Sequence, residues 1–77
     1  MATLDQMKIG QSATVTAVGG VGSAIYQRLL EMGVFEGTTI EVIRRAPLGD
    51  PLEVRVHGYN LSVRKTEAVC IQVEVDK

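Results

Sequence analysis

The side chains that most often bind metals or attack substrates are scarce in this sequence, which holds one histidine, His57, and one cysteine, Cys70. A structural zinc site takes four Cys or His ligands, and two such residues cannot complete it. Each of the two alternates with an apolar neighbour, so we expect His57 to point to solvent and Cys70 to lie outward or at a sheet edge. The residues predict no catalytic site, and the chain is not expected to be an enzyme. A weak metal site assisted by carboxylates, or shared between two molecules, stays open.

A glycine run, Gly19–Gly22, separates a predicted strand from a predicted helix, as in the phosphate-binding turn of a Rossmann unit. The position of the third motif glycine holds Ile25, where close packing of helix on strand requires Gly or Ala. No Gly-Lys-Ser/Thr follows, so no lysine can reach a phosphate. A chain of 77 residues also ends before a doubly wound sheet is complete. We therefore interpret the run as a flexible strand-to-helix connection.

The segment Ala46–Pro51 has the composition of a stiff loop. Its two prolines, Pro47 and Pro51, fix φ near both ends, and Gly49 permits a left-handed turn between them. Leu48 at the tip should be exposed. A rigid loop with an apolar tip loses little entropy on docking, which favours a recognition surface that includes Pro47, Leu48 and Asp50. A well-made long hairpin turn without further function is the alternative interpretation.

Two other features favour a partner protein. An apolar corner at the end of the predicted helix contains Met32, Val34 and Phe35. Basic residues lie on or near the predicted strand ends, namely Arg44, Arg45, Arg55, Arg64 and Lys65. They could gather against an acidic partner, or they could pair with glutamates on the surface of the sheet, where such pairs stabilise little. Nucleic acid is not expected, because the net charge is -1 and aromatic residues are only 4% of the chain.

Length and composition predict one small domain over residues 1–77. The hydrophobic share of 45% and the charged share of 22% are ordinary for a soluble globular protein. No apolar run approaches the roughly 20 residues that span a bilayer, so membrane insertion is not expected. The N-terminus has no apolar signal-peptide core, and the lone cysteine fits a reducing compartment, so we expect a cytoplasmic protein.

Apolar and polar residues alternate in five short segments, which predicts five strands. One longer segment has apolar residues at i, i+4 and i+7 and predicts a helix, with Ser23 as N-cap and Gly33 just beyond its end. The strands are expected at residues 12–18, 39–45, 52–56, 61–63 and 71–75, and the helix at 23–32. This order predicts a mainly β fold, a small five-stranded antiparallel barrel with one α-helix between strands 1 and 2.

Irregular features are also predicted. The alternation breaks at Ile43, which indicates a bulge near Ile43 and Arg44. A tight hairpin turn is expected at residues 57–60, with Gly58 at its first central position. Residues 3–7 and 65–68 each suit a single helical turn.

Specific motifs occur in the order Leu29–Thr38, Ala46–Pro51, Leu61–Lys65 and Glu67-Ala68. In combination they resemble the FeoA family, the small cytosolic proteins of the bacterial ferrous-iron uptake system. The resemblance extends from about Leu4 to Val75, and only the glycine run departs from it. It implies an SH3-like β-barrel, in agreement with the predicted strand order, and no catalytic residue.

The resemblance also implies a function. It indicates a non-catalytic accessory protein that binds the cytosolic region of FeoB, the membrane iron transporter, and modulates uptake. The alternative is a metal-responsive, Fe²⁺-sensing SH3-like domain related to the C-terminal module of DtxR-type repressors. No cofactor is expected, although a weak Fe²⁺ site and a homo-oligomer stay open. The residues expected to contact the partner are Met32, Val34, Phe35, Pro47, Leu48, Asp50, Arg64 and Lys65.

Overall fold

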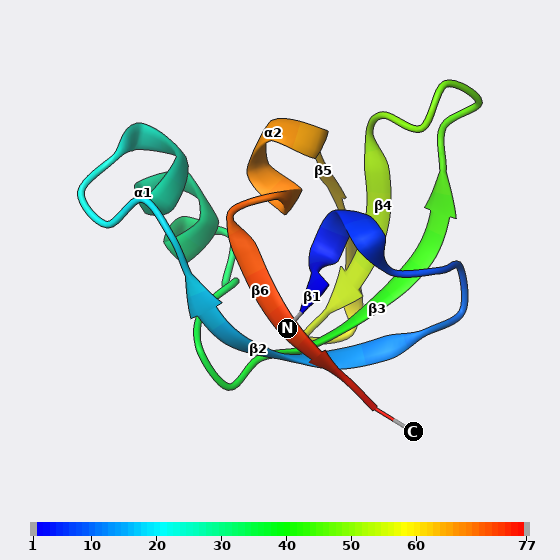
Figure 1. The fold of residues 1–77 in the computed structure, drawn as a ribbon, viewed down its shortest axis with the longest axis horizontal. Helices are drawn as coiled ribbons and strands as arrows, with labels where there is room; N and C mark the ends of the chain where they lie inside the picture. The colour runs from blue at the N-terminus through cyan, green and yellow to red at the C-terminus, as the bar shows by residue number, and fades with distance from the viewer. Residues whose placement is uncertain (1, 77) are drawn as a thin grey trace.

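The computed structural model describes residues 2–76, which form one curved antiparallel sheet with three short helical segments (Figure 1). The elements in chain order are β1 (Ala2–Thr3), the 3₁₀ turn η1 (Leu4–Gln6), β2 (Ser12–Val18), α1 (Ala24–Glu31), β3 (Thr39–Arg45), β4 (Leu52–Val56), β5 (Tyr59–Val63), α2 (Lys65–Ala68) and β6 (Ile71–Val75). The sheet has the order β1-β6-β2-β3-β4-β5. The five predicted strands are confirmed, and the two-residue strand β1 is a sixth that the sequence analysis missed.

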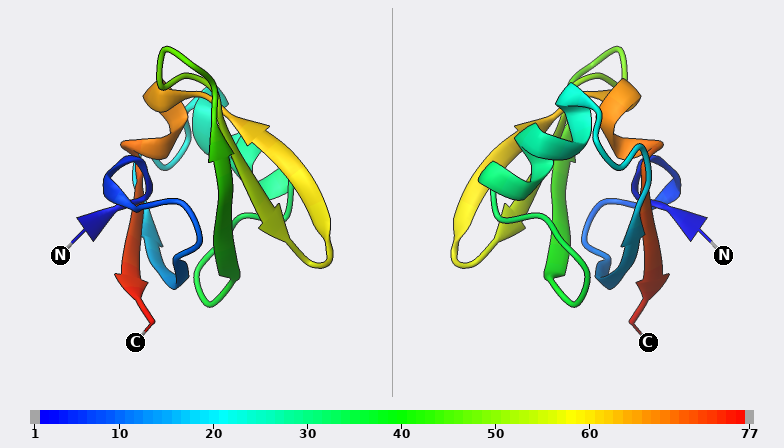
Figure 2. Two further views of the ribbon diagram at one scale, coloured as in Figure 1. Left: turned by 90° about the vertical axis from the view of Figure 1, so that its right-hand side faces the viewer. Right: turned by 90° about the vertical axis from the view of Figure 1, so that its left-hand side faces the viewer.

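The sheet folds back on itself around a small core. Figure 2 shows β1, β6 and β2 in one half and β3, β4 and β5 in the other, with both helices across the top. Alternate residues of the strands point inward, as the period of two requires. Fully enclosed side chains include Val15 of β2, Ile40 and Val42 of β3, Val54 of β4 and Ile71 of β6.

Helix α1 begins and ends where the sequence predicts. The Ser23 hydroxyl accepts a hydrogen bond from the Tyr26 backbone N–H over 3.1 Å, which satisfies a free donor of the first turn. Gly33 follows the helix with φ of 84°, a left-handed conformation that side chains disfavour. Leu29 is the one residue of α1 that is fully buried, so few apolar contacts attach the helix to the sheet.

Two irregularities bend the strands. The register between β3 and β4 shifts between Val42 and Arg44, which confirms the predicted bulge. A second shift, between Val15 and Ala17 in the pairing of β2 with β6, was not predicted. Bulges increase the local twist, and here they lie where the sheet curls toward a barrel.

The hairpin between β4 and β5 differs from the prediction. Val56 pairs with Tyr59, so the two turn residues are His57 and Gly58, and Gly58 is at the second central position rather than the first. Both turn residues have positive φ, 51° and 83°, as a type I′ turn requires. The turn came one residue earlier than expected because histidine adopts this conformation here. The exposed His57 ring contacts protein, with Nε2 3.0 Å from the carbonyl oxygen of Gly33.

The turn after α1 gives a first prediction, on Gly33. A Cβ at position 33 would lie 3.0 Å from His57 Cδ2 and 3.2 Å from its Nε2, closer than ordinary contact. Gly37 also has positive φ, but a Cβ there meets nothing within 4 Å. We expect Gly37→Ala to cost about 1 kcal/mol of unfolding free energy through backbone strain alone. Gly33→Ala should cost about 1 kcal/mol more, because the His57 ring must also shift.

Chemical denaturation of both variants measures the two costs, with wild type as reference. Equal destabilisation by the two substitutions would show that the His57 ring does not press on the end of α1.

Candidate functional site

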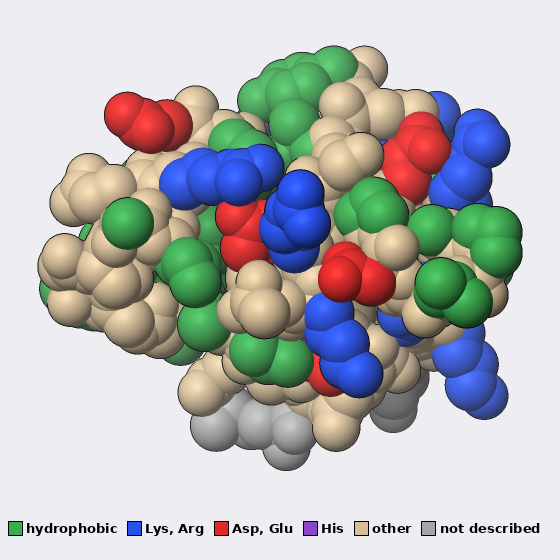
Figure 3. Space-filling model, turned by 90° about the horizontal axis from the view of Figure 1, so that it is seen from above, with side chains coloured by type: hydrophobic (Ala, Val, Ile, Leu, Met, Phe, Trp, Pro, Cys, Tyr) green, Lys and Arg blue, Asp and Glu red, His purple; other side chains and the backbone are tan. Residues whose placement is uncertain are grey.

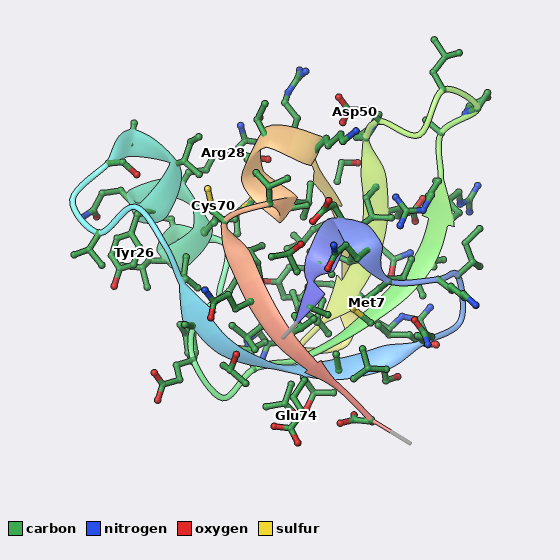
Figure 4. The ribbon with its side chains drawn as sticks, viewed as in Figure 1. Met7, Tyr26, Arg28, Asp50, Cys70 and Glu74 are labelled. Atoms are coloured by element: carbon green, nitrogen blue, oxygen red, sulfur yellow. The ribbon has the colours of Figure 1, made fainter. Side chains whose placement is uncertain are left out.

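The proline loop, residues 46–51 between β3 and β4, is fastened at its base. The Ala46 N–H donates to the Pro51 carbonyl over 3.1 Å, and the Gly49 N–H donates to the Ala46 carbonyl over 2.7 Å. The Asp50 carboxylate accepts the backbone N–H of Lys65 over 2.9 Å, which ties the loop to the start of α2 (Figure 4). Leu48 at the tip is 97% exposed. The loop therefore holds an apolar side chain in solvent with its base fixed.

A cleft lies between this loop and the N-terminal segment. Its volume is about 200 Å³, and it is lined by Asp5, Arg45, Leu48, Gly49, Leu52, Lys65 and Ala68. The Arg45 guanidinium donates to the backbone carbonyls of Asp5 and Met7, and so joins the end of β3 to the turn after η1. Arg45 is consequently a structural residue of the cleft wall.

Helix α2 is held by a buried carboxylate. One oxygen of Glu67 accepts the Arg64 N–H over 2.9 Å, and the other lies 3.2 Å from Arg28 Nε. The Glu67 side chain is only 4% exposed, so these two donors replace most of its water. Figure 4 shows Arg28 reaching from α1 toward α2. These bonds fix the backbone at Arg64 and Lys65, two residues predicted to contact a partner.

Apart from Arg45, the basic residues named at the strand ends divide into two groups. Arg44 Nε lies 2.9 Å from Glu53, and Arg55 lies 4.0 Å from Glu41, so these two belong to cross-strand pairs on the sheet surface. Within residues 2–76, Arg64 and Lys65 make no ion pair, and both are exposed.

Lys65 lines the same cleft as Leu48, and Arg64 precedes it in the chain. We call Pro47, Leu48, Asp50, Arg64 and Lys65 the proline-loop surface. Figure 3 shows the molecule from this side, where basic and acidic side chains alternate across the centre and hydrophobic ones lie at the right-hand end, at the top and at the left.

The three side chains of the apolar corner after α1 differ in their exposure to solvent. Val34 has 0% exposure, so its side chain belongs to the core and the prediction that it contacts a partner is wrong. The reason is local, since the backbone N–H of Val34 donates to the Leu29 carbonyl over 2.8 Å and the chain turns inward at Gly33. Met32 is partly buried against the core, whereas Phe35 is 45% exposed.

Phe35 lines a second cleft, the helix cleft, which the sequence analysis missed. It has a volume of about 220 Å³ and is lined by Ala17, Val18, Val21, Tyr26, Leu30, Phe35 and Glu36. Val21 is 79% exposed in the glycine run. A valine between glycines in a loop was the available signal, because such a residue has no strand or helix to bury it.

The barrel separates the two predicted contact regions. Figures 1 and 2 place the proline loop at the top of the molecule and the turn after α1 toward the bottom, at opposite ends of β3. The two clefts share no lining residue. The eight residues expected to contact one partner therefore cannot form one continuous surface.

The remaining chemical candidates are separate from one another. The Cys70 thiol is 3.6 Å from the Thr66 carbonyl oxygen, whereas the His57 ring contacts Gly33. The part of the chain that the structure describes contains no group of three or more His, Cys, Asp or Glu side chains placed to hold a metal ion. In residues 2–76, no helix combines the length and the apolar character needed to cross a membrane.

Comparison with known proteins gives consistent matches. The model of the FeoA domain family matches residues 2–75. A fusion of Fe(2+) transport protein A with the Fe(2+) transporter FeoB, from Porphyromonas gingivalis, is 40% identical over 72 residues. That match covers 94% of this chain but only 8% of the fusion protein.

Two solved structures support the SH3-like fold. FeoA of Stenotrophomonas maltophilia, a prokaryotic SH3 domain protein complexed with zinc, is 30% identical with a TM-score of 0.82, over 96% of this chain and 91% of that one. A manganese-dependent transcriptional repressor has a TM-score of 0.88 at 15% identity, over 96% of this chain and 40% of the repressor, which shows the fold alone. The predicted SH3-like barrel is thus confirmed.

The buried carboxylate gives a second prediction. Glu67→Gln should lower the free energy of unfolding by about 1–3 kcal/mol, because the amide nitrogen cannot accept a bond from Arg28. Glu74→Gln is the matched control, since Glu74 is exposed on β6 and should change stability by less than about 0.5 kcal/mol. Thermal or denaturant unfolding compares the two variants. Equal, small effects would mean that the Glu67 bonds do not stabilise the fold.

Proposed function

The chain belongs to the FeoA family, and on this premise we propose that it is a non-catalytic accessory protein of ferrous-iron transport that binds the cytosolic region of FeoB and modulates uptake. The observation that carries the proposal is the Porphyromonas gingivalis relative, in which the equivalent domain and the transporter are one polypeptide. Fusion keeps two domains at high local concentration, which is useful when they act on each other. In this proposal the domain meets the transporter on its cytoplasmic side.

The proline-loop surface is the part of this protein best suited to dock on a transporter domain. Leu48 is almost wholly exposed on a loop whose base is already ordered, so little conformational entropy remains to be lost on binding. Lys65 lines the same cleft as Leu48, and neither Lys65 nor the preceding Arg64 has an ion-pair partner among the described residues. Charged groups around an apolar anchor set orientation and association rate. The expected partner surface is therefore an apolar pocket with carboxylates at its rim.

The apolar anchor gives a third prediction. Leu48→Asp should weaken binding to the soluble cytosolic domain of FeoB at least tenfold, because a carboxylate replaces the side chain that would enter the pocket. The fold should be unchanged, since Leu48 contributes no buried area. Val21→Asp is the matched control, an exposed apolar residue of the helix cleft that should leave binding unchanged.

An NMR titration of the isotope-labelled protein with the FeoB domain measures both variants and maps the contact. Signals of residues 47–50 and 64–65 should shift. Loss of binding in Val21→Asp but not in Leu48→Asp would move the docking site to the helix cleft.

The free cations give a fourth prediction. Lys65→Glu should reduce the association rate with the FeoB domain about tenfold and make it less sensitive to salt, because a steering charge near the contact is inverted. Lys8→Glu changes the net charge equally, on an exposed residue that does not line the cleft beside the proline loop. Stopped-flow mixing at several salt concentrations compares the two variants. Equal effects would indicate that only net charge matters.

A metal-responsive function is the second candidate, favoured by the zinc complex of the Stenotrophomonas maltophilia relative. Anaerobic calorimetry with Fe²⁺ and with Zn²⁺ tests it directly. Binding at tens of micromolar that is lost in a His57→Ala or a Cys70→Ser variant would support this candidate. If neither metal binds, the adaptor function would be the one remaining candidate.

A further inference from the structure

Strand β5 is a free edge of the sheet. It pairs with β4 along its whole length, from Tyr59 to Val63, and the described chain places no strand on its other side. Figure 2 shows β5, in yellow, at the outer side of its half of the sheet. The opposite edge, β1, is only two residues long, and shortness is itself a protection against pairing. Strand β5 has five residues, an unbroken register, no charge and no proline, so it lacks the usual protections.

The turn type decides which backbone groups face outward. Residues that flank a two-residue turn form a hydrogen-bonded pair, and such pairs alternate along an antiparallel ladder. Val56 and Tyr59 flank the turn, so Tyr59, Leu61 and Val63 direct their N–H and C=O groups to β4. Asn60 and Ser62 consequently direct theirs to the free edge.

The long side chains next to this edge are drawn away from it. The Asn60 amide accepts from Arg55 Nε over 3.2 Å and donates to Glu53 over 2.9 Å, and both partners belong to β4. The Tyr59 hydroxyl donates to the Met32 carbonyl over 2.9 Å, on the α1 side. Ser62 is small and exposed. The outward backbone groups of β5 are therefore accessible to another extended strand.

We propose that β5 pairs antiparallel with β5 of a second copy of this chain, about a twofold axis at Leu61. In this register Asn60 of each copy lies opposite Ser62 of the other, so the interface has two hydrogen-bonded pairs. These pairs use all four outward-facing groups of each strand, the N–H and C=O of Asn60 and of Ser62. Leu61 lies opposite its own symmetry mate, and the backbone of Tyr59 lies opposite that of Val63, whose side chain is buried in its own core.

This register suits the side chains of β5. No like charges meet, because the strand carries none. An isologous contact of this kind closes after two copies.

The contact is small. Two five-residue strands offer less than the roughly 1,200 Å² of a stable interface, so the dimer should form at high protein concentration and dissociate on dilution. Its register makes it accessible to cross-linking. Residues opposite each other in a pair without hydrogen bonds have Cα atoms about 4.5 Å apart, within the range that a disulfide spans.

The first test is therefore disulfide capture in a Cys70→Ser background, which removes the native thiol. Leu61→Cys should form a covalent dimer on mild oxidation. Glu74→Cys, an exposed position on β6, is the control for chance collisions and should remain monomeric. No dimer from Leu61→Cys, or equal amounts from both variants, would overturn the proposal.

The second test needs no added cysteine. Ser62→Pro removes one outward N–H without touching the ladder to β4, and Ser62→Ala keeps that N–H. Sedimentation over a series of concentrations up to about 1 mM should show a dimer for wild type and Ser62→Ala. Ser62→Pro should weaken it at least tenfold. A dimer that survives Ser62→Pro would overturn the proposal. A wild type that stays monomeric would also overturn it, and if Ser62→Pro then weakened FeoB binding, the edge would have another role.

Discussion

The carboxylate of Glu67 is the constraint on which the position of the proline-loop surface depends. The Glu67 carboxylate pairs with Arg28 of α1 and accepts the backbone N–H of Arg64 at the start of α2. The next residue, Lys65, donates its backbone N–H to Asp50 of the proline loop, so three segments distant in sequence are joined. A buried carboxylate without partners would cost several kcal/mol, so these donors must stay in place while the protein is folded. The position of the loop is thereby coupled to the position of α1.

Helix α1 shows why polar bonds have this importance in so small a domain. Leu29 is its one fully buried residue, and a chain of 77 residues has little apolar area with which to hold a helix. The His57 ring and the Tyr59 hydroxyl therefore contact the carbonyls of Gly33 and Met32 at the end of the helix. The one histidine, which composition alone marks as a metal or catalytic candidate, thus makes a structural contact at a helix C-terminus.

Local patterns account for the parts of the fold that could be predicted. Alternation located β2, β3, β4 and β6, while Ser23 and Gly33 located the ends of α1, because caps and periodicity depend on neighbouring residues only. The hairpin turn was misplaced by one residue, since His57 adopts a backbone conformation that usually belongs to Gly or Asn. The burial of Val34 and the separation of the proline loop from the helix corner depend on how the sheet closes, and no local pattern reports that closure.

The two proposed contacts have consequences for each other. A domain fused to its transporter needs little intrinsic affinity, because the linker keeps the local concentration in the millimolar range. Without a covalent link, one exposed apolar side chain with basic residues nearby is a modest contact. Pairing through β5 would present two proline loops from one assembly, and two weak contacts that can be made together bind far more tightly than one. In this arrangement the free edge of β5 and the exposed Leu48 would together compensate for the weakness of a single contact.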